Sequence, residues 1–444
     1  MSASLASEPV TDRALAAEAG KTAELIANRL ADPEVVRAAV AQAEETARYP
    51  YGWGGASLYA GHAGSAVLFR QAARVLTDEA ERWRELAHEH LLVAVRGTHE
   101  VPLMDIGLAA GSAGLAFAVA DAAGEDPRYS NGLRNLDRKL CEQVAGTPSW
   151  RRDDGVADRD YDVIVGAASG LVRVAAADPA DPAVKEAADR LLDDLMWLCA
   201  PRDGKRPWFI QPEFYPAEDY HETFPHGYVN LGLAHGVPGP LAALSLARVA
   251  GHGDDRLLAT IRQVADYVVG AALMDDHGPT WPMGIPLTES GEEHRHGLSP
   301  ARNAWCYGPP GVACALLHAA TALDDPELRE FAVLAVEGVL RRLTDHVHFG
   351  SATLCHGAAG MLAICARFAR DTGSAVARRM LPVLTQAVLE HCDPGLPLGV
   401  QDLEQPGVLL DSPALLTGAA GVALALWSVS TPLPAGWERA LLIG

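Results

Sequence analysis

Two kinds of apolar segment alternate along the chain. Stretches such as 114–120, 311–317 and 421–427 are apolar at nearly every position, which predicts helices that protein or lipid must enclose. The stretches between them are amphipathic, and several begin with Asp-Pro, a pair that suits a helix N-cap and first turn. This pair stands at positions 32–33, 126–127, 181–182 and 325–326. We therefore predict an inner ring of buried helices and an outer ring of amphipathic ones, with little strand.

A repeated motif precedes the buried stretches: two glycines three residues apart, followed by an apolar run. Its copies are Gly61–Gly64, Gly111–Gly114, Gly236–Gly239, Gly308–Gly311, Gly357–Gly360 and Gly418–Gly421, with a degenerate seventh copy at Ala167–Gly170. Successive copies are 49 to 72 residues apart, which is enough for a helical hairpin and its loops. Such repeats are typical of a fold built from equivalent units. Glycine allows close backbone approach where each buried helix begins.

The composition is that of a folded protein without polyanionic partners. Hydrophobic residues make up 49% of the 444 residues, enough for a sizeable core. The 36 basic and 57 acidic residues give a net charge of −21, which argues against nucleic acid and anionic lipid as partners. A chain of this length often forms two or three domains. Because no linker-like tract interrupts the repeats, we predict one domain over residues 11–444, preceded by a flexible segment 1–10.

The cysteines and the N-terminus favour a reducing compartment. The seven cysteines are widely spaced and odd in number, unlike those of a disulfide scaffold. The N-terminus carries Glu8 and Asp12 and lacks the basic and apolar regions of a secretory signal. The longest uncharged apolar stretch, 106–120, is too short to span a membrane. We predict a soluble, cytoplasmic protein without a transmembrane segment.

Two long segments do not follow the helical pattern. Residues 201–229 are rich in aromatic side chains, and residues 275–304 include a run of charged and histidine residues. Long irregular segments in a compact domain are usually functional or disordered. The aromatic content of the first predicts an ordered lid or substrate wall, with a plain structural loop as the alternative.

Three motif copies carry side chains that can bind a metal. Cys306 lies two residues before its glycine, Cys355 and His356 directly precede theirs, and His235 occupies the same place as His356. If the repeats form a ring, equivalent positions converge at one end of it, and these side chains meet. Two thiolates and an imidazole suit Zn²⁺. The alternative is two ordinary buried cysteines and a histidine that caps a helix.

These motifs resemble those of lanthionine synthetase C-like proteins, in particular the stand-alone lanthipeptide cyclases of that family. The resemblance rests on Trp-Cys-Tyr-Gly at 305–308, Cys-His-Gly at 355–357 and His-Gly-x-x-Gly at 235–239, and it runs from Gly61 to Trp427. It implies an all-α fold, an α/α toroid of inner and outer helices, which agrees with the two rings predicted above.

The resemblance also implies roles for individual side chains. It assigns Cys306, Cys355 and His356 as ligands of one Zn²⁺ per chain, His235 as the active-site histidine, and Arg302, Tyr307 and Asp162 as further catalytic residues. Ala167 stands where the family usually has glycine, which affects local packing rather than the chemistry.

The implied reaction is addition of a peptide cysteine thiol to dehydroalanine or dehydrobutyrine, which closes a lanthionine or methyllanthionine ring. Zinc would deprotonate the thiol, and three protein ligands leave the open position of a catalytic site. His235 would transfer the proton, because imidazole titrates near neutral pH. Arg302 would stabilise the enolate oxygen, Tyr307 would donate a hydrogen bond, and Asp162 would orient His235 or Arg302. Alternatively, Asp162 and Arg302 form a structural ion pair.

A cyclase of this kind needs partners, and other functions remain open. The implied partners are a dehydrated precursor peptide with a leader segment and a separate dehydratase, since the repeats leave no room for one here; an exporter complex is a further candidate. One alternative is an enzyme of the same fold that adds glutathione or another small thiol to dehydroamino acids. Another is a non-catalytic, zinc-holding scaffold that binds peptide. A glycosidase would need paired carboxylates, and the motif copies carry none.

Overall fold

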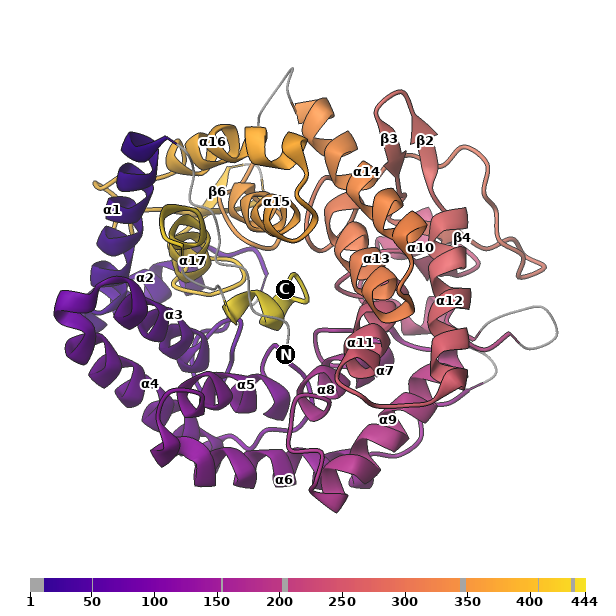
Figure 1. The fold of residues 1–444 in the computed structure, drawn as a ribbon, viewed down its shortest axis with the longest axis horizontal. Coiled ribbons are helices and arrows are strands. Elements are labelled where there is room, and N and C mark those ends of the chain that lie inside the picture. The colour runs from indigo at the N-terminus through magenta and orange to yellow at the C-terminus, as the bar shows by residue number, and fades with distance from the viewer. Residues whose placement is uncertain are drawn as a thin grey trace. The chain divides into compact units, whose positions relative to one another are not determined.

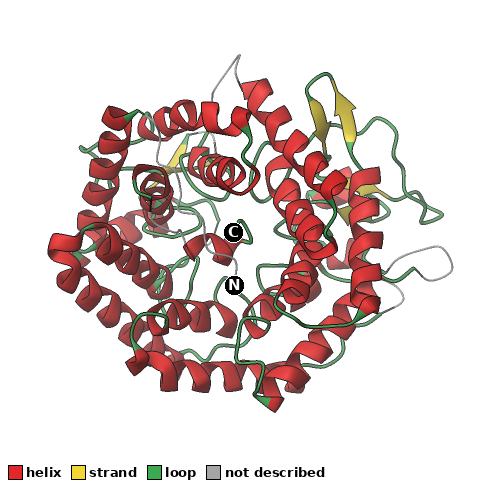
Figure 2. Cartoon of the chain, viewed as in Figure 1, coloured by secondary structure: helices red, strands yellow, loops and turns green. Residues whose placement is uncertain are grey.

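The fold is built almost entirely of helices (Figure 2). The computed structural model describes residues 12–49, 51–152, 155–201, 207–343, 349–405, 407–432 and 436–444. The predicted flexible segment 1–10 lies outside these residues. Strands form only three short antiparallel pairs among the described residues, so the predicted all-α class is confirmed. None of the described helices is long and apolar enough to cross a membrane.

The chain separates into two compact units, each made of segments that are distant in sequence. Unit 1 comprises residues 1–103, 117–131 and 340–444, and unit 2 comprises residues 104–116 and 132–339. Helices α5 (Ser112–Ala123), α6 (Ser130–Gly146) and α14 (Pro326–Leu343) begin in one unit and end in the other. The single domain over residues 11–444 stays a prediction.

In unit 1, three buried helices each pack against an amphipathic partner (Figure 1). The pairs are α3 (His62–Val75) with α4 (Ala80–Glu100), α15 (Ala358–Thr372) with α16 (Ala375–Leu389), and α17 (Ala419–Ser430) with α1 (Arg13–Leu30). Because α17 also contacts α3 and α15, the three buried helices lie side by side. The unit also contains α2 (Pro33–Thr46), the 3₁₀ turns η1 (Thr77–Glu79), η2 (Pro127–Tyr129) and η4 (Gly436–Leu441), and the strands β5 (Asp402–Gln405) and β6 (Val408–Leu410).

Unit 2 repeats this arrangement. The buried helix α11 (Pro238–Val249) packs between α8 (Ala167–Val174) and α13 (Pro309–Leu323). The amphipathic helix α9 (Pro182–Cys199) covers α8, and α12 (Asp255–Gly270) covers α11 and α13. The unit also contains α7 (Asp158–Tyr161), α10 (Tyr220–Thr223), the 3₁₀ turn η3 (Pro212–Phe214), and the strands β1 (Tyr228–Asn230), β2 (Leu273–Asp275), β3 (Gly278–Thr280) and β4 (Gly284–Pro286).

The predicted alternation of buried and amphipathic helices is confirmed. All residues from Pro309 to Ala320 of α13 and from Ala419 to Val429 of α17 are buried. The amphipathic helices start at their Asp-Pro pairs: the carboxylates of Asp32 and Asp181 each accept a hydrogen bond of 2.9 Å from the backbone N–H two residues further on. By contrast with α13, helix α12 buries one stripe of residues: Leu257, Ile261, Val264, Ala265 and Val268.

The two long segments predicted to depart from the helical pattern do so, and a strand pair joins them. β1 pairs antiparallel with β4, with Val229 opposite Ile285. The backbone of Ile210 in the first segment also exchanges hydrogen bonds with Tyr228. β2 and β3 form a separate hairpin within unit 2. The described parts of both segments are thus held against one another by backbone hydrogen bonds.

The glycine motifs mark the starts of the buried helices. Gly61, Gly308, Gly357 and Gly418 are the N-cap residues of α3, α13, α15 and α17. Gly308 has a φ of +103°, and a Cβ there would lie 1.9 Å from the carbonyl oxygen of Arg302. A Cβ on Gly421 would lie 2.0 Å from the carbonyl oxygen of Leu415. The preceding loop therefore passes so close to the helix start that a side chain cannot fit.

The seventh copy is displaced by one residue from the position predicted at Ala167–Gly170. Gly166 is the N-cap of α8, and the backbone N–H of Ser169 donates to the carbonyl of Asp162, seven residues earlier. The second glycines at positions 64, 114 and 360 make the same bond, each to the carbonyl seven residues earlier. The seventh copy of the motif is therefore Gly166–Ser169. The predicted pair Ala167–Gly170 is one residue too late, because a serine occupies the position of the second glycine. The hydroxyl of Ser169 donates to the carbonyl of Gly166 at 2.7 Å.

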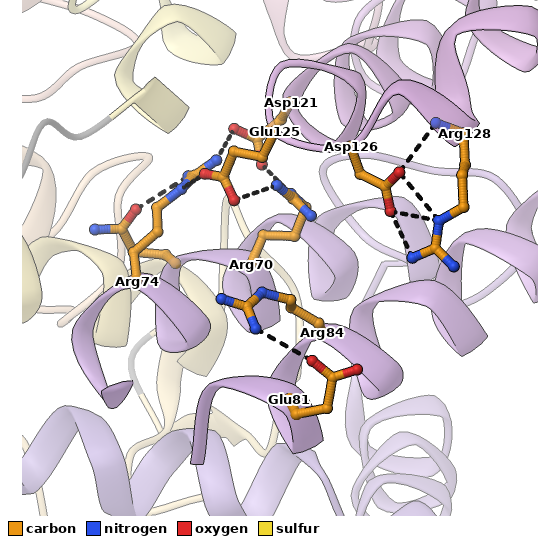
Figure 3. A network of polar contacts seen from close by, with 9 residues as sticks. Arg70, Arg74, Glu81, Arg84, Asp121, Glu125, Asp126 and Arg128 are labelled. Carbon is orange, nitrogen blue, oxygen red and sulfur yellow. Dashed lines mark hydrogen bonds and ion pairs between the residues drawn. The ribbon is translucent and has the colours of Figure 1, made fainter. Parts of the chain in front are cut away.

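Unit 1 also contains a partly buried ionic network (Figure 3). Arg70 on α3 is 5% exposed in its side chain and lies 3.1 Å from Asp121 and 2.7 Å from Glu125. Arg74, one turn along α3, pairs with the same two carboxylates at 2.7 and 2.6 Å. Since each arginine meets both acids, the network fixes α3 against the end of α5, and it serves packing rather than chemistry.

Candidate functional site

The loops before the buried helices are tied to one another at equivalent positions. We count from the first glycine of each motif, so that position −2 is the residue two before it, and Gly166 is the first glycine of the seventh copy. In unit 2, the N–H groups of Ala109, Val163 and Ala234 donate to the carbonyls of Ile164, Ala234 and Cys306 at 3.0, 3.2 and 3.3 Å. In unit 1, the N–H groups of Cys355 and Leu416 donate to the carbonyls of Leu416 and Tyr59, both at 3.1 Å. All of these residues except Val163 occupy position −2, so side chains at positions −1 and −2 of adjacent copies are neighbours within each unit.

Asp162 and His235 form the central contact of the site in unit 2. Their side chains meet at 2.7 Å between Oδ2 of Asp162 and Nδ1 of His235. The other oxygen of Asp162 accepts three backbone N–H groups at 2.8 to 3.0 Å, from residues 164, 165 and 166. Asp162 is only 1% exposed, whereas the His235 side chain is 35% exposed. The loop therefore fixes the carboxylate, and the carboxylate fixes an imidazole that solvent or a ligand can reach.

The environment of His235 favours its protonated form. Burial by itself lowers the pKa of this imidazole, but the hydrogen bond and charge of Asp162 outweigh it, and the pKa is raised above its ordinary value. The charges of Asp158 and Cys306 act in the same direction. Since Asp162 accepts at Nδ1, the neutral ring carries its proton there, and Nε2 is left as the basic nitrogen.

The helical turn α7 holds the backbone of His235 as well as its ring. The hydroxyl of Tyr161 donates to the carbonyl of His235 at 3.0 Å. Asp158, Tyr161 and Asp162 follow the i, i+3, i+4 spacing, so one turn presents all three on one face. Burial raises the pKa of the Asp158 carboxyl, while the charge of His235 opposes that rise. The sequence did not single out Asp158 or Tyr161, because neither lies in a glycine motif.

A hydroxyl cluster adjoins the imidazole. The rings of Tyr307 and His235 are 6.5 Å apart, and the Tyr307 hydroxyl accepts a hydrogen bond of 3.3 Å from the amide of Asn230. Burial raises the pKa of the Tyr307 phenol well above its ordinary value, so the group keeps its proton. Tyr220 of α10 also interacts with Tyr307. Asn230, which the sequence did not single out, stands at position −6, and four of the other six copies also have a side-chain oxygen there: Asp105, Asp160, Ser351 and Ser412.

Aromatic side chains of the first irregular segment pack around this cluster. Phe224 stacks on Tyr228 with ring centroids 4.3 Å apart, and Tyr215 and Tyr220 each lie 5.7 Å from Tyr228. Ile210 is buried in the same group. The described part of the segment is thus an ordered aromatic wall beside His235 and Tyr307, and its role as a lid or substrate wall stays a prediction.

Arg302 does not occupy the place that one sequence alternative gave it. Its side chain is exposed, and its positive charge opposes the rise that burial produces in the pKa of Tyr220. The carboxylate of Asp162 instead meets His235 and the three backbone N–H groups. Of the two partners that the sequence left open for Asp162, the structure shows His235.

The predicted metal ligands come from both units. Cys306 lies in unit 2 beside the His235 loop and is 8% exposed. Cys355 and His356 lie in unit 1, directly before α15, and both are partly exposed. The imidazole Nε2 of His356 is 3.9 Å from Asp402, whose carboxylate accepts the Ser351 hydroxyl at 2.6 Å. Among the described residues, no three His, Cys, Asp or Glu side chains within one unit form a metal site.

These donors fit zinc in chemistry. A thiol and an imidazole are preferred zinc ligands, and a carboxylate hydrogen-bonded to a ligand histidine is a common arrangement. Cys355 lies three residues before the first residue of α15. Burial raises the pKa of the Cys365 thiol inside α15 above its ordinary value, which is the state of a core cysteine.

Comparison with known proteins places the chain in a family. Residues 52–442 match the profile of the family described as lanthionine synthetase C-like protein. The chain therefore belongs to the lanthionine synthetase C-like proteins, as its motifs predicted. A curated relative, the nisin biosynthesis protein NisC of Lactococcus lactis subsp. lactis, is 26% identical over 264 residues; the alignment spans 59% of this chain and 62% of that protein. The solved structure of nisin cyclase superposes with a TM-score of 0.75 at 22% identity and covers 92% of this chain and 96% of its own, which confirms the predicted fold class.

Proposed function

We propose that this protein is a zinc-dependent lanthipeptide cyclase, which adds cysteine thiols of a dehydrated peptide to dehydroalanine or dehydrobutyrine. The observation that carries the proposal is the Asp162–His235 pair, held beside Cys306 by loops of the family's motifs. Membership of the lanthionine synthetase C-like family and the similarity to NisC and nisin cyclase support the same reaction. The product is a thioether ring.

The reaction needs a base and an acid but no oxidant. The S–H bond breaks, a bond forms between sulfur and the β-carbon, and the α-carbon gains a proton, so the peptide keeps its atoms. His235 accepts the thiol proton at Nε2 because Asp162 holds the other ring nitrogen protonated. The resulting imidazolium, stabilised by Asp162, returns a proton to the α-carbon. One residue can thus serve both halves of the addition.

The charge that develops on the substrate carbonyl requires donors. Tyr307 keeps its proton and lies beside His235, so its hydroxyl can donate to the enolate oxygen. Arg302 is exposed near Tyr220 and supplies positive charge to the same region. We assign both residues to stabilisation of the enolate.

We propose Cys306, Cys355 and His356 as the ligands of one zinc ion. When bound, zinc would hold the substrate thiol as a thiolate, which is the nucleophilic form. Purified protein should contain about one zinc per chain. Cys355→Ala should lose it, whereas Cys365→Ala, a change at a buried core thiol, should not. Full zinc content in Cys355→Ala would remove the ligand assignment.

The proposal implies partners and a setting. The substrate is a precursor peptide with a leader segment, already dehydrated by a separate dehydratase, and an exporter complex is a further proposed partner. All seven cysteines lie in the described part of the chain and none of them forms a disulfide, which suits a reducing compartment such as the cytoplasm.

The test is ring closure in a purified system. Because cyclisation does not change mass, free thiols are counted by alkylation and mass spectrometry after incubation with a dehydrated peptide. Wild-type protein should consume thiols, and His235→Asn should keep its zinc while slowing consumption by about 10²-fold or more. Asp411→Asn, at a buried carboxylate in unit 1, is the matched control and should behave as wild type.

Added glutathione separates the alternatives in the same assay. Substrate that gains the mass of glutathione while its own thiols persist would indicate addition of a small thiol instead of cyclisation. Peptide that binds but remains chemically unchanged would indicate a scaffold. Either result contradicts the proposed cyclase.

A further inference from the structure

Asn230 is a buried amide whose hydrogen bonds are all accounted for. It is 0% exposed, and it ends strand β1 directly before the His235 loop. Its Oδ1 accepts the backbone N–H of Gly232 at 2.9 Å. Its Nδ2 donates to the hydroxyl oxygens of Tyr307 and Tyr228 at 3.3 and 3.4 Å. The Gly232 bond fixes which end of the amide is oxygen, so Nδ2 must face the two phenols.

The amide thereby sets the direction of the Tyr307 hydroxyl. An amide N–H can only donate, so the Tyr307 oxygen is the acceptor of that bond and its own proton is available elsewhere. In the free protein Tyr307 also interacts with the phenol of Tyr220, which comes from the aromatic wall. An oxygen atom of a substrate is a chemically equivalent acceptor and can replace Tyr220 there.

We infer that Asn230 is a positioning residue that holds Tyr307 as a hydrogen-bond donor toward the substrate carbonyl. The inference rests on the proposed cyclase function for the role of Tyr307, but the orientation of the hydroxyl is a property of the free protein. Asparagine is required because aspartate has no proton to give. With a carboxylate at position 230, Tyr307 and Tyr228 would both turn their protons inward, and the donor would be lost.

Kinetics test the role. Asn230→Asp should lower kcat for ring closure by about 10²-fold, the usual loss on removing one donor to a developing oxyanion, with KM little changed. Tyr307→Phe should cause the same loss, and the double variant should lose no more than either single one. Tyr59→Phe is the matched control: Tyr59 is a buried tyrosine of unit 1 whose hydroxyl donates to the carbonyl of Ala440 at 2.8 Å, and the kcat of this variant should stay near wild type.

A spectroscopic measurement tests the geometry without any activity. With ¹⁵N-labelled asparagine, Tyr307→Phe should shift one of the two Asn230 side-chain amide protons, and Tyr228→Phe should shift the other. If neither substitution moves an amide proton, Asn230 does not hold Tyr307 and the inference is wrong. If the protons respond but losses in the double variant multiply, Asn230 acts through folding alone, which also overturns it. If wild-type protein closes no rings, the cyclase proposal fails, and the amide shifts still decide whether Asn230 orients Tyr307.

Discussion

Asp162→Asn is the sharpest perturbation of the proposed mechanism, because it changes one atom of the site. The asparagine Oδ1 can keep the three backbone N–H bonds that fix the loop. Its Nδ2 replaces the oxygen that lies 2.7 Å from Nδ1 of His235, and an amide nitrogen must donate there. Nδ1 therefore becomes an acceptor, the ring proton moves to Nε2, and the nitrogen proposed as the base is blocked.

The size of the effect follows from the interaction that is removed. A hydrogen bond to a charged group contributes about 1.5 to 3 kcal/mol, which corresponds to about 10- to 150-fold in rate. An attraction of about 4 kcal/mol between unit charges roughly 4 Å apart sets an upper bound near 10³-fold. Since the His235 side chain is 35% exposed, solvent screening reduces the upper figure. We expect kcat to fall by about 10²-fold, with KM within about twofold.

Two measurements decide this prediction. Thiol consumption gives the rate, and ¹⁵N chemical shifts of labelled histidine give the tautomer of His235. The wild-type ring should be protonated at Nδ1 and the variant ring at Nε2, while the thermal unfolding temperature changes little because the loop keeps its bonds. A variant that retains the Nδ1 proton, or that closes rings at the wild-type rate with the altered tautomer, would refute the role of Asp162.

Three further predictions concern stability. Gly308→Ala should lower the free energy of unfolding by about 3 kcal/mol, because φ is +103° and the new Cβ would collide with a carbonyl oxygen. Gly297→Ala, where φ is positive but the space is open, should lower it by about 1 kcal/mol. Urea titration of both variants compares the two losses. Arg173→Met should cost about 3 to 5 kcal/mol, since it leaves a buried carboxylate without its 2.7 Å partner, and Arg128→Met at an exposed pair should show no measurable change. Burial, together with the charge of a neighbouring histidine, lowers the pKa of His90 to about 4. Between pH 6.5 and 4 the unfolded chain therefore binds a proton at this residue that the folded chain does not. The free energy of unfolding should fall as the pH drops through that range, by up to about 3 kcal/mol. His90→Gln should flatten this dependence, and an unchanged pH profile would contradict the assignment.

The fold could be predicted from the sequence because each repeat is marked by a pair of glycines. Each buried helix starts where a loop passes beneath it, and a Cβ at Gly308 or Gly421 would collide with backbone, so the pattern is visible in one sequence. The motif copy at α8 is predicted one residue too late, because Ser169 makes the backbone hydrogen bond that a glycine makes in other copies, and a serine is not recognised as part of a glycine motif. A residue type therefore identifies a structural position only where steric hindrance excludes every other residue type.

The candidate site was predictable in part for a similar reason. His235 and Cys306 stand at positions defined by the motif, and position −2 links their loops. Tyr161 and Asn230 were missed because their roles depend on three-dimensional contacts, a carbonyl 3.0 Å away in one case and two phenols in the other. The choice of His235 over Arg302 as the partner of Asp162 likewise needed coordinates.

The position −2 hydrogen bonds have a consequence for how such a protein can be altered. They use backbone atoms alone, so the loops stay joined whatever side chains they carry. Four copies hold no ligand or catalytic group at positions −2 and −1: Tyr59–Ala60, Ala109–Ala110, Ile164–Val165 and Leu416–Thr417. Ala110 is exposed, so a new side chain there needs no space in the core. The fold thus has loop positions without a catalytic or ligand side chain, equivalent to those that carry one. Protein design or natural selection can place a side chain there that recognises a different peptide, without disturbing the buried helices.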